Sequence, residues 1–332
     1  MKIRELQIEK VRSFRGRHRL SFEDPLTGQV RPLTVIVGSN GCGKTTALEV
    51  MFQMTASAFE EDRDATAEMN HMTRGSGAAS VTWNADDLRD DLREVTHQTG
   101  GQDPVAVVNE TYTWHMRRQD HARWPPYAMR AGTRPLQGGL LVFWHDRWTS
   151  QPEKGSVEPP PDQKSWLWTY EPDHRWKGSL AQHWVWQNYL DLEAQAEGRP
   201  NLAPFVEVIE EVLGAGRKVS IRRGRVHVTT PYGEAVEPWQ LPSGEQQILT
   251  LFGELARQMR PGAVVLIDEV EISLHPALQR KVIHIMRRLA ARYDLQFIVT
   301  THSLEIVRAV DPSEVLDLDG TALEAQASAE PT

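Results

Sequence analysis

The sequence predicts an α/β fold with a mixed central sheet, and two stretches of the chain lead to this prediction. Residues 33–58 join a short β-branched run, a glycine-rich loop and apolar residues at helical spacing. Two further apolar runs, 263–267 and 297–299, lie on either side of an amphipathic helical pattern. Short apolar runs that alternate with helices are typical of strands buried on both faces of a sheet.

The composition is that of an ordinary globular protein. The chain has 332 residues, enough for one large α/β domain with insertions or for two domains. Hydrophobic residues make up 40%, yet no run approaches the roughly 20 apolar residues of a membrane helix, and the start lacks the apolar region of a secretory signal. The single cysteine, Cys42, excludes an intramolecular disulfide. We therefore expect a cytoplasmic protein.

The charge balance is acidic, with 45 Asp and Glu against 37 Lys and Arg and a net charge of −8. Proteins that bind nucleic acid on their own usually carry the opposite balance. Any DNA contact therefore needs a local basic patch or a partner. One such patch is Arg222, Arg223 and Arg225 in a predicted hairpin, for which a solvated surface is the alternative interpretation.

The first 58 residues are predicted to form one part of the core. Residues 3–22 place apolar side chains among polar ones, as two short strands do. Residues 33–37 form a buried strand, and apolar residues at helical spacing predict a helix from Lys44 to Ala58.

Residues 59–200 are predicted to form an inserted lateral lobe. Residues 60–105 are polar and interrupted by glycine, so we expect loops around at most one short strand or helix. Strand character returns at 106–118, and 140–144 is another apolar run. Residues 151–172 are rich in proline and charge and are expected to form a long loop.

Tryptophan is concentrated in this lobe, since nine of the chain's 11 tryptophans lie between Trp114 and Trp186. Large aromatic side chains can fill a small core, and this interpretation is favoured. They can also form a surface for partner docking or base stacking, and the sequence alone leaves that alternative open.

Residues 201–318 are predicted to form the other part of the core. A hairpin is expected around Arg223, and Ser243 is expected to cap the N-terminus of a helix. The small polar residues of 319–332 predict a disordered tail. Helical patterns occur at 205–213, 243–259 and 278–289.

The most specific motif is the glycine loop between the strand at 33–37 and its helix, which fits G-x-x-x-x-G-K-[ST] in full. Glycines let successive backbone N–H groups point into one concavity, so the loop is predicted to cradle the phosphates of ATP. Lys44 is expected to reach the outer phosphates, and the Thr45 hydroxyl to ligate Mg²⁺. The predicted ATP-binding residues are Gly38, Ser39, Asn40, Gly41, Cys42, Gly43, Lys44, Thr45 and Thr46.

An apolar strand that ends in two carboxylates follows at 264–269. The end of such a strand lies at the sheet edge where ligands bind in open α/β folds. Asp268 is therefore predicted to hold Mg²⁺, and Glu269 to polarise the attacking water.

Two further motifs are ambiguous when taken alone. Ser243, Gly244 and Glu245 open a helix, and their plainest role is a cap. Because an acidic strand follows them, they can also form a second helix N-terminus that binds phosphate. The glycine loop already serves the chain's own nucleotide, so the γ-phosphate at this second position would come from a second copy of the protein. His302 follows a strand, where it is either an ordinary turn residue or a sensor of the γ-phosphate.

The order of these motifs resembles that of the ABC-type ATPases, which are P-loop NTPases, and most of all the non-transporter branch of RecF, OLD and SMC proteins. The resemblance covers residues 1–58 and 200–310. It implies an ABC-ATPase head with an antiparallel β lobe and an ATP-sandwiched homodimer. Lys44, Glu269 and His302 would be catalytic. Ser243, Gly244 and Glu245 would be the signature that completes a partner's site, and Ser273 and His275 would belong to the D-loop at the dimer interface.

The sequence also departs from the family pattern. Val270 stands where a proline is usual, and no coiled-coil heptads or acidic nuclease domain appear. The glutamine of the family's Q-loop is not placed, because four candidates remain: Gln98, Gln102, Gln119 and Gln137.

The function expected from the sequence is an ATP-driven switch that acts with a protein effector in DNA maintenance or in defence against foreign DNA. Its cofactors are ATP and Mg²⁺, and no membrane association is expected. The alternative is the nucleotide-binding subunit of an ABC transporter, which would need a membrane partner. A third interpretation makes the tryptophan-rich lobe a nucleic-acid binder.

Overall fold

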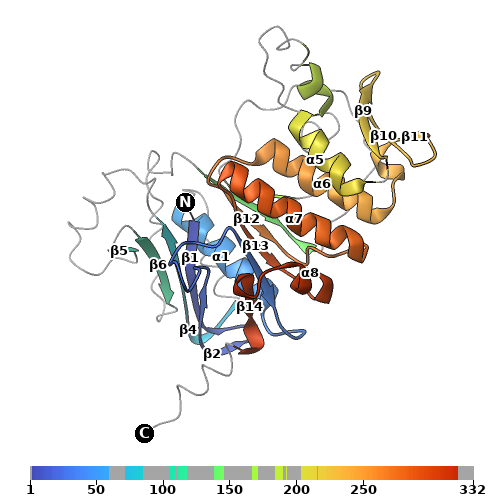
Figure 1. Ribbon diagram of the computed structural model, residues 1–332. Coiled ribbons are helices and arrows are strands. Elements are labelled where there is room, and N and C mark those ends of the chain that lie inside the picture. Colours follow the sequence, from blue (N-terminus) through green and yellow to red (C-terminus); the bar gives the residue numbers. More distant parts are fainter. Residues whose placement is uncertain are drawn as a thin grey trace.

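The structure is a computed structural model, and its described part contains three sheets and four longer helices (Figure 1). It describes residues 2–59, 72–84, 105–108, 111–117, 138–145, 167–170, 184–189, 192, 203–214 and 216–320.

The central sheet has six strands in the order β14–β3–β13–β12–β7–β8. All of its pairings are parallel. The predicted strands at 33–37, 263–267 and 297–299 are confirmed. The strands are β3 (Leu33–Val37), β7 (Leu140–Phe143), β8 (Leu167–Thr169), β12 (Val264–Ile267), β13 (Gln296–Thr300) and β14 (Val315–Asp317).

Five antiparallel strands form a separate sheet in the order β2–β1–β4–β6–β5. Parallel and antiparallel pairings are thus both present, as a mixed sheet would have them, but the parallel pairings lie in the central sheet and the antiparallel pairings in other sheets. β4 has 12 residues, which exceeds the short element expected between residues 60 and 105. The strands are β1 (Lys2–Val11), β2 (Phe14–Ser21), β4 (Thr73–Asn84), β5 (Val105–Val108) and β6 (Thr111–Arg117).

The two faces of the central sheet bury two hydrophobic cores. Helix α1 (Lys44–Phe59) lies between the central and the antiparallel sheet (Figure 1), and its core includes Ile36 and Leu266. Alternate residues of the same strands, such as Val35 and Ile267, point into the second core. That core is closed by helices α5 (Ala203–Leu213), α6 (Ser243–Gln258) and α7 (Pro276–Tyr293).

One buried glutamine joins the two large sheets. The side chain of Gln296 on β13 accepts a hydrogen bond from the Ile3 N–H at 2.7 Å and donates one to the Ile3 carbonyl at 2.7 Å. Gln296 and Ile3 are both fully buried, so these bonds satisfy backbone groups of Ile3 that water cannot reach. The glutamine thereby fixes β1 relative to the central sheet.

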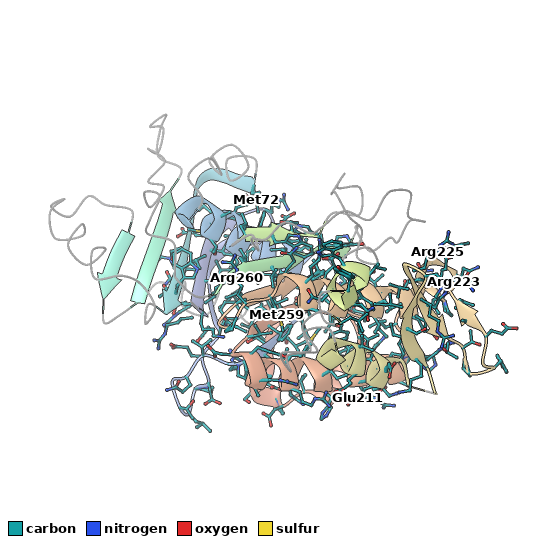
Figure 2. The ribbon with its side chains drawn as sticks, turned by 90° about the horizontal axis from the view of Figure 1, so that it is seen from above. Met72, Glu211, Arg223, Arg225, Met259 and Arg260 are labelled. Carbon is teal, nitrogen blue, oxygen red and sulfur yellow. The ribbon has the colours of Figure 1, made fainter. Side chains whose placement is uncertain are left out.

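The C-terminal half contains the predicted hairpin. β9 (Lys218–Arg222) and β10 (Arg225–Thr229) pair around a turn in which Arg223 and Gly224 have φ values of 52° and 73°. β11 (Ala235–Val236) adds a third strand. Figure 2 shows Arg223 and Arg225 at this end of the molecule, remote from Met72 beside the antiparallel sheet. Short elements complete the chain: η3 (Pro238–Gln240), α8 (Leu304–Ala309) and η4 (Pro312–Glu314).

The predicted cap at Ser243 is wrong. Helix α6 begins one residue earlier, because the N–H groups of Glu245 and Gln246 both donate to the Pro242 carbonyl, at 2.9 Å and 3.0 Å. Pro242 is therefore the N-cap, and no side chain caps this helix end. Ser243 is the first residue of the helix and is exposed.

The boundaries predicted for the inserted lobe differ from the observed pairing. β7 and β8 belong to the central sheet and β4 to the antiparallel sheet, although all three fall within 59–200. β8 also lies within 151–172, for which the composition predicts a long loop. Among the described residues of 59–200, four tryptophans pack in the cores or against them: Trp83, Trp144, Trp168 and Trp184.

Some predictions fall outside the described residues. These concern the four candidate Q-loop glutamines and the tail from Thr321 onward. Within the described part of the chain, no helix combines the length and the hydropathy needed to cross a membrane.

Candidate nucleotide-binding site

The glycine loop connects β3 to α1, and its glycines are sterically required. Gly38, Gly41 and Gly43 have φ values of 145°, 79° and 115°, which side chains with a Cβ rarely adopt. A Cβ on Gly43 would lie 2.6 Å from a ring carbon of Phe14. A Cβ on Gly38 would lie 2.7 Å from the sulfur of Cys42. The loop is thus folded tightly against β1–β2 and against itself.

Lys44 turns back over this loop. Its ammonium donates hydrogen bonds to the carbonyls of Gly38 and Ser39 at 2.9 Å and 3.0 Å, and the residue is only 5% exposed. A buried ammonium that is bonded to loop carbonyls places a fixed positive charge beside the glycine loop. This placement suits the phosphate-binding role predicted for Lys44.

Asp268 lies at the C-terminal end of β12 with no exposed surface. Both of its carboxylate oxygens lie 3.1 Å from the Thr45 hydroxyl, so the P-loop and the acidic strand meet as the sequence predicts. The Thr300 hydroxyl donates to Asp268 at 2.7 Å and accepts from the Glu269 N–H at 2.8 Å. These oxygen groups are the hard ligands that Mg²⁺ prefers.

Two neighbours of Asp268 were not predicted from the sequence. Thr300 ends β13, which lies between β3 and β12 in the sheet. His145 follows β7, the other neighbour of β12, and its Nδ1 lies 2.5 Å from Asp268 Oδ2. The available signal for His145 was a polar residue directly after the apolar run at 140–144.

Glu269 and His302 face each other across the same edge of the sheet. His302 Nε2 lies 3.8 Å from Glu269 Oε1, and the two side chains are 36% and 30% exposed, in that order. Glu269 has a φ of 48°, which turns the backbone sharply at the end of β12. The two predicted catalytic groups are therefore close to each other and accessible.

Glu271 is a further carboxylate at this turn. It accepts a hydrogen bond from the Thr301 hydroxyl at 2.8 Å and another from the His302 N–H at 2.5 Å. The loop after the acidic strand thus holds the turn that carries His302. His275, for which a D-loop position is predicted, caps α7, because its ring accepts a hydrogen bond from the Ala277 N–H at 3.3 Å.

The predicted signature residues lie at the start of α6. A Cβ on Gly244 would lie 2.5 Å from the Ser273 carbonyl oxygen, so glycine is required for the helix to pack on the backbone of Ser273. Glu245 accepts a hydrogen bond from Arg217 at 2.5 Å. Among the described residues, no hydrogen bond or ion pair joins Ser243, Gly244 or Glu245 to the P-loop.

Asp319 binds the P-loop from the other side. Its carboxylate accepts hydrogen bonds from the Ser39 N–H at 2.7 Å and from the Ser39 hydroxyl at 3.0 Å. β14, which pairs with β3, brings Asp319 to this position. The predicted tail from residue 319 therefore starts too early, because Asp319 takes part in the site.

Burial raises the pKa of the Cys42 thiol above its usual value, and the nearby Lys44 ammonium opposes this shift. We expect iodoacetamide to modify Cys42 slowly at pH 7, and faster as the pH approaches the raised pKa, because only the thiolate reacts. Full modification should weaken ATP binding, since the sulfur lies inside the loop. Intact-mass spectrometry measures the extent of alkylation, because the chain has one cysteine. Nucleotide titration measures the affinity for ATP.

Cys42→Ser is the control, because it keeps the size of the side chain and should bind ATP normally. Unchanged nucleotide affinity after complete alkylation would contradict the placement of Cys42 in the phosphate cradle.

Two family descriptions match the chain. Residues 142–308, slightly more than half of the 332 residues, match the family described as "AAA domain, putative AbiEii toxin, Type IV TA system". Residues 5–113 match another family described as "AAA domain". The two matches cover the glycine loop and the acidic strand, and Asp319 lies beyond them.

Similar curated proteins match short segments. "Retron Ec83 probable ATPase" of Escherichia coli is 34% identical over 87 residues, which are 23% of this chain and 16% of that protein. "Probable amino-acid ABC transporter ATP-binding protein y4tH" of Sinorhizobium fredii is 38% identical over 73 residues, 22% of this chain and 27% of that protein. The chain thus aligns with about a quarter or less of each relative.

A solved structure matches almost the whole chain. The structure described as the "SmcHead bound to the C-winged helix domain of ScpA" covers 96% of this chain and 94% of its own, with 14% identity and a TM-score of 0.56. At this identity the likeness shows the fold. Together with the family matches, it confirms the predicted fold and the resemblance to the RecF, OLD and SMC branch.

Proposed function

The chain belongs to the AAA-domain family matched by residues 142–308, and on this premise we propose that it is an ATPase switch that binds ATP with Mg²⁺ and hydrolyses it. The observation that carries the proposal is the contact of Thr45 with both oxygens of Asp268 at 3.1 Å. It joins the end of the phosphate-binding loop to a buried carboxylate, which is the arrangement that a nucleotide-bound magnesium ion requires.

Each residue of the site then has a role. Lys44 and the loop N–H groups bind the phosphates and offset their charge. Thr45 and Asp268 would hold Mg²⁺, which withdraws charge from the phosphate oxygens when bound. Glu269 orients the attacking water and accepts its proton, and His302, next to it, donates to the γ-phosphate.

We further propose that a second copy of the chain completes the site. Ser243 is exposed at the N-terminus of the 16-residue helix α6, and the positive end of a helix dipole attracts phosphate. Within the described part of the chain, none of the signature residues is bonded to the P-loop, so this helix end can serve the nucleotide of a partner. The packing of Gly244 on Ser273 would couple that contact to the D-loop.

The proposed setting is defence or DNA maintenance with a protein effector, which the similarity to a retron ATPase supports over a short segment. The transporter alternative is supported by the similarity to an ABC transporter subunit over 73 residues. Co-purification with a polytopic membrane protein would favour the transporter. Capture of a non-membrane effector by the ATP-bound chain would favour the switch.

Lys44→Ala tests the ATP-binding role. The substitution removes this fixed positive charge, and we expect ATP affinity to fall by about 10–100-fold, which is the effect of losing a charge-assisted hydrogen bond to phosphate. Titration with a fluorescent ATP analogue measures it. Lys218→Ala, at an exposed lysine on β9, is the control and should bind as the wild type does. Wild-type affinity in Lys44→Ala would refute the site.

A further inference from the structure

His145 reaches the proposed metal site from a strand that none of the recognised motifs includes. β7 pairs in parallel with β12 so that Phe143 lies opposite Ile267, and the Asp268 N–H donates to the Phe143 carbonyl at 2.8 Å. The residues that follow Phe143 therefore lie at the same edge of the central sheet as Asp268. His145 Nδ1 lies 2.5 Å from Asp268 Oδ2.

The hydrogen bonds of Asp268 divide between its two oxygens. Thr300 donates to Oδ1 at 2.7 Å, His145 lies on Oδ2, and Thr45 lies 3.1 Å from both. An ionised carboxylate only accepts hydrogen bonds, so the proton of this contact belongs to Nδ1. Asp268 itself is fully buried, whereas the His145 side chain is 41% exposed.

The Thr45 hydroxyl would ligate the ion through a lone pair and would keep its proton for Asp268. Thr300 and His145 contact the carboxylate from the neighbouring strands, one on each oxygen. Such outer partners fix the orientation of a metal ligand and commonly change metal affinity by about 10–100-fold.

We propose that His145 is a positioning residue that holds Asp268 for the divalent cation and so sets the cation affinity of the site. This inference rests on the proposed function. It assigns to β7 a contribution to the ATPase site in addition to its place in the sheet. His145 acts through Asp268, by a single N–H donor, and neither binds the nucleotide nor takes part in the reaction itself.

The test is the affinity for Mn²⁺, a spectroscopic substitute for Mg²⁺, measured by electron paramagnetic resonance with a non-hydrolysable ATP analogue bound. His145→Ala removes the donor and is expected to weaken Mn²⁺ binding by about 10–100-fold. His145→Asn places an amide N–H near the position of Nδ1 and should recover most of this loss. Binding of the analogue in excess EDTA should stay within about twofold in both variants, because the metal-free contacts of the P-loop do not include His145.

Unchanged Mn²⁺ affinity in His145→Ala would overturn the inference. An equal loss of analogue binding in EDTA would also overturn it, because it would place His145 in the nucleotide site instead. Thermal unfolding of each variant establishes that it is folded. If the wild-type protein binds neither analogue nor Mn²⁺, the proposed function fails. If the wild type and His145→Ala bind the analogue and Mn²⁺ equally well, the proposed role of His145 fails but the proposed function stands.

Discussion

Glu269→Gln is expected to slow ATP hydrolysis by about 10²–10⁴-fold, because an amide cannot accept the proton of the attacking water. Glu269 follows Asp268 directly, and its side chain is 30% exposed beside His302 at the edge of the central sheet. The substitution keeps the size of the side chain and leaves Lys44 and Thr45 in place. ATP binding should therefore change little. Single-turnover phosphate release and an equilibrium nucleotide titration measure the two effects separately.

A matched control is Glu211→Gln, at an exposed carboxylate on α5 that pairs with Arg288 at 2.8 Å (Figure 2). It makes the same chemical change far from the P-loop and should leave the hydrolysis rate unchanged. A Glu269→Gln variant that hydrolyses ATP at the wild-type rate would show that another group polarises the water.

Ser243→Arg is expected to lower ATP turnover by at least about 10²-fold without loss of folding, because donors aimed at the reacting phosphate have effects of this size. Ser243 is exposed at the first position of α6, so the larger side chain fits without moving the chain. In the proposed assembly the arginine would lie where the partner's γ-phosphate approaches. Steady-state hydrolysis measures the loss, and sedimentation measures the ATP-dependent dimer.

Leu26→Arg is the control for Ser243→Arg. It adds the same side chain at a position that is 94% exposed, in the turn between β2 and β3. It should hydrolyse ATP as the wild type does. Full activity of Ser243→Arg, at protein concentrations where the wild type dimerises, would contradict the role given to the start of α6.

The parts of the fold that were predicted from the sequence are those with strong local patterns. Residues 33–58 combine an apolar run, glycines that need unusual φ values and a helical repeat, and β3 and α1 match the prediction closely. The acidic pair after β12 was likewise visible, because a buried strand that ends in two carboxylates places them at the edge where an open α/β sheet binds its ligands.

The residues that were missed act over long distances in the chain. His145 contacts Asp268 across 123 positions, and Asp319 contacts Ser39 across 280. Only the order of strands in the sheet brings these pairs together, and a local pattern does not encode that order. The short strand β8 has three residues and carried no repeat that could be recognised. The error at Ser243 is of another kind, since the backbone of Pro242 begins the helix where a side-chain cap was expected.

The central claim is that the ATP site is shared between two copies of the chain, and mixing two inactive variants tests it most directly. Lys44→Ala lacks a working P-loop but keeps the start of α6, and Ser243→Arg has the reverse defect. In a 1:1 mixture, about half of the dimers would combine the two chains and regain one complete site each, so hydrolysis should return to about a quarter of the wild-type rate. Activity no higher than the sum of the two separate variants would contradict a shared site.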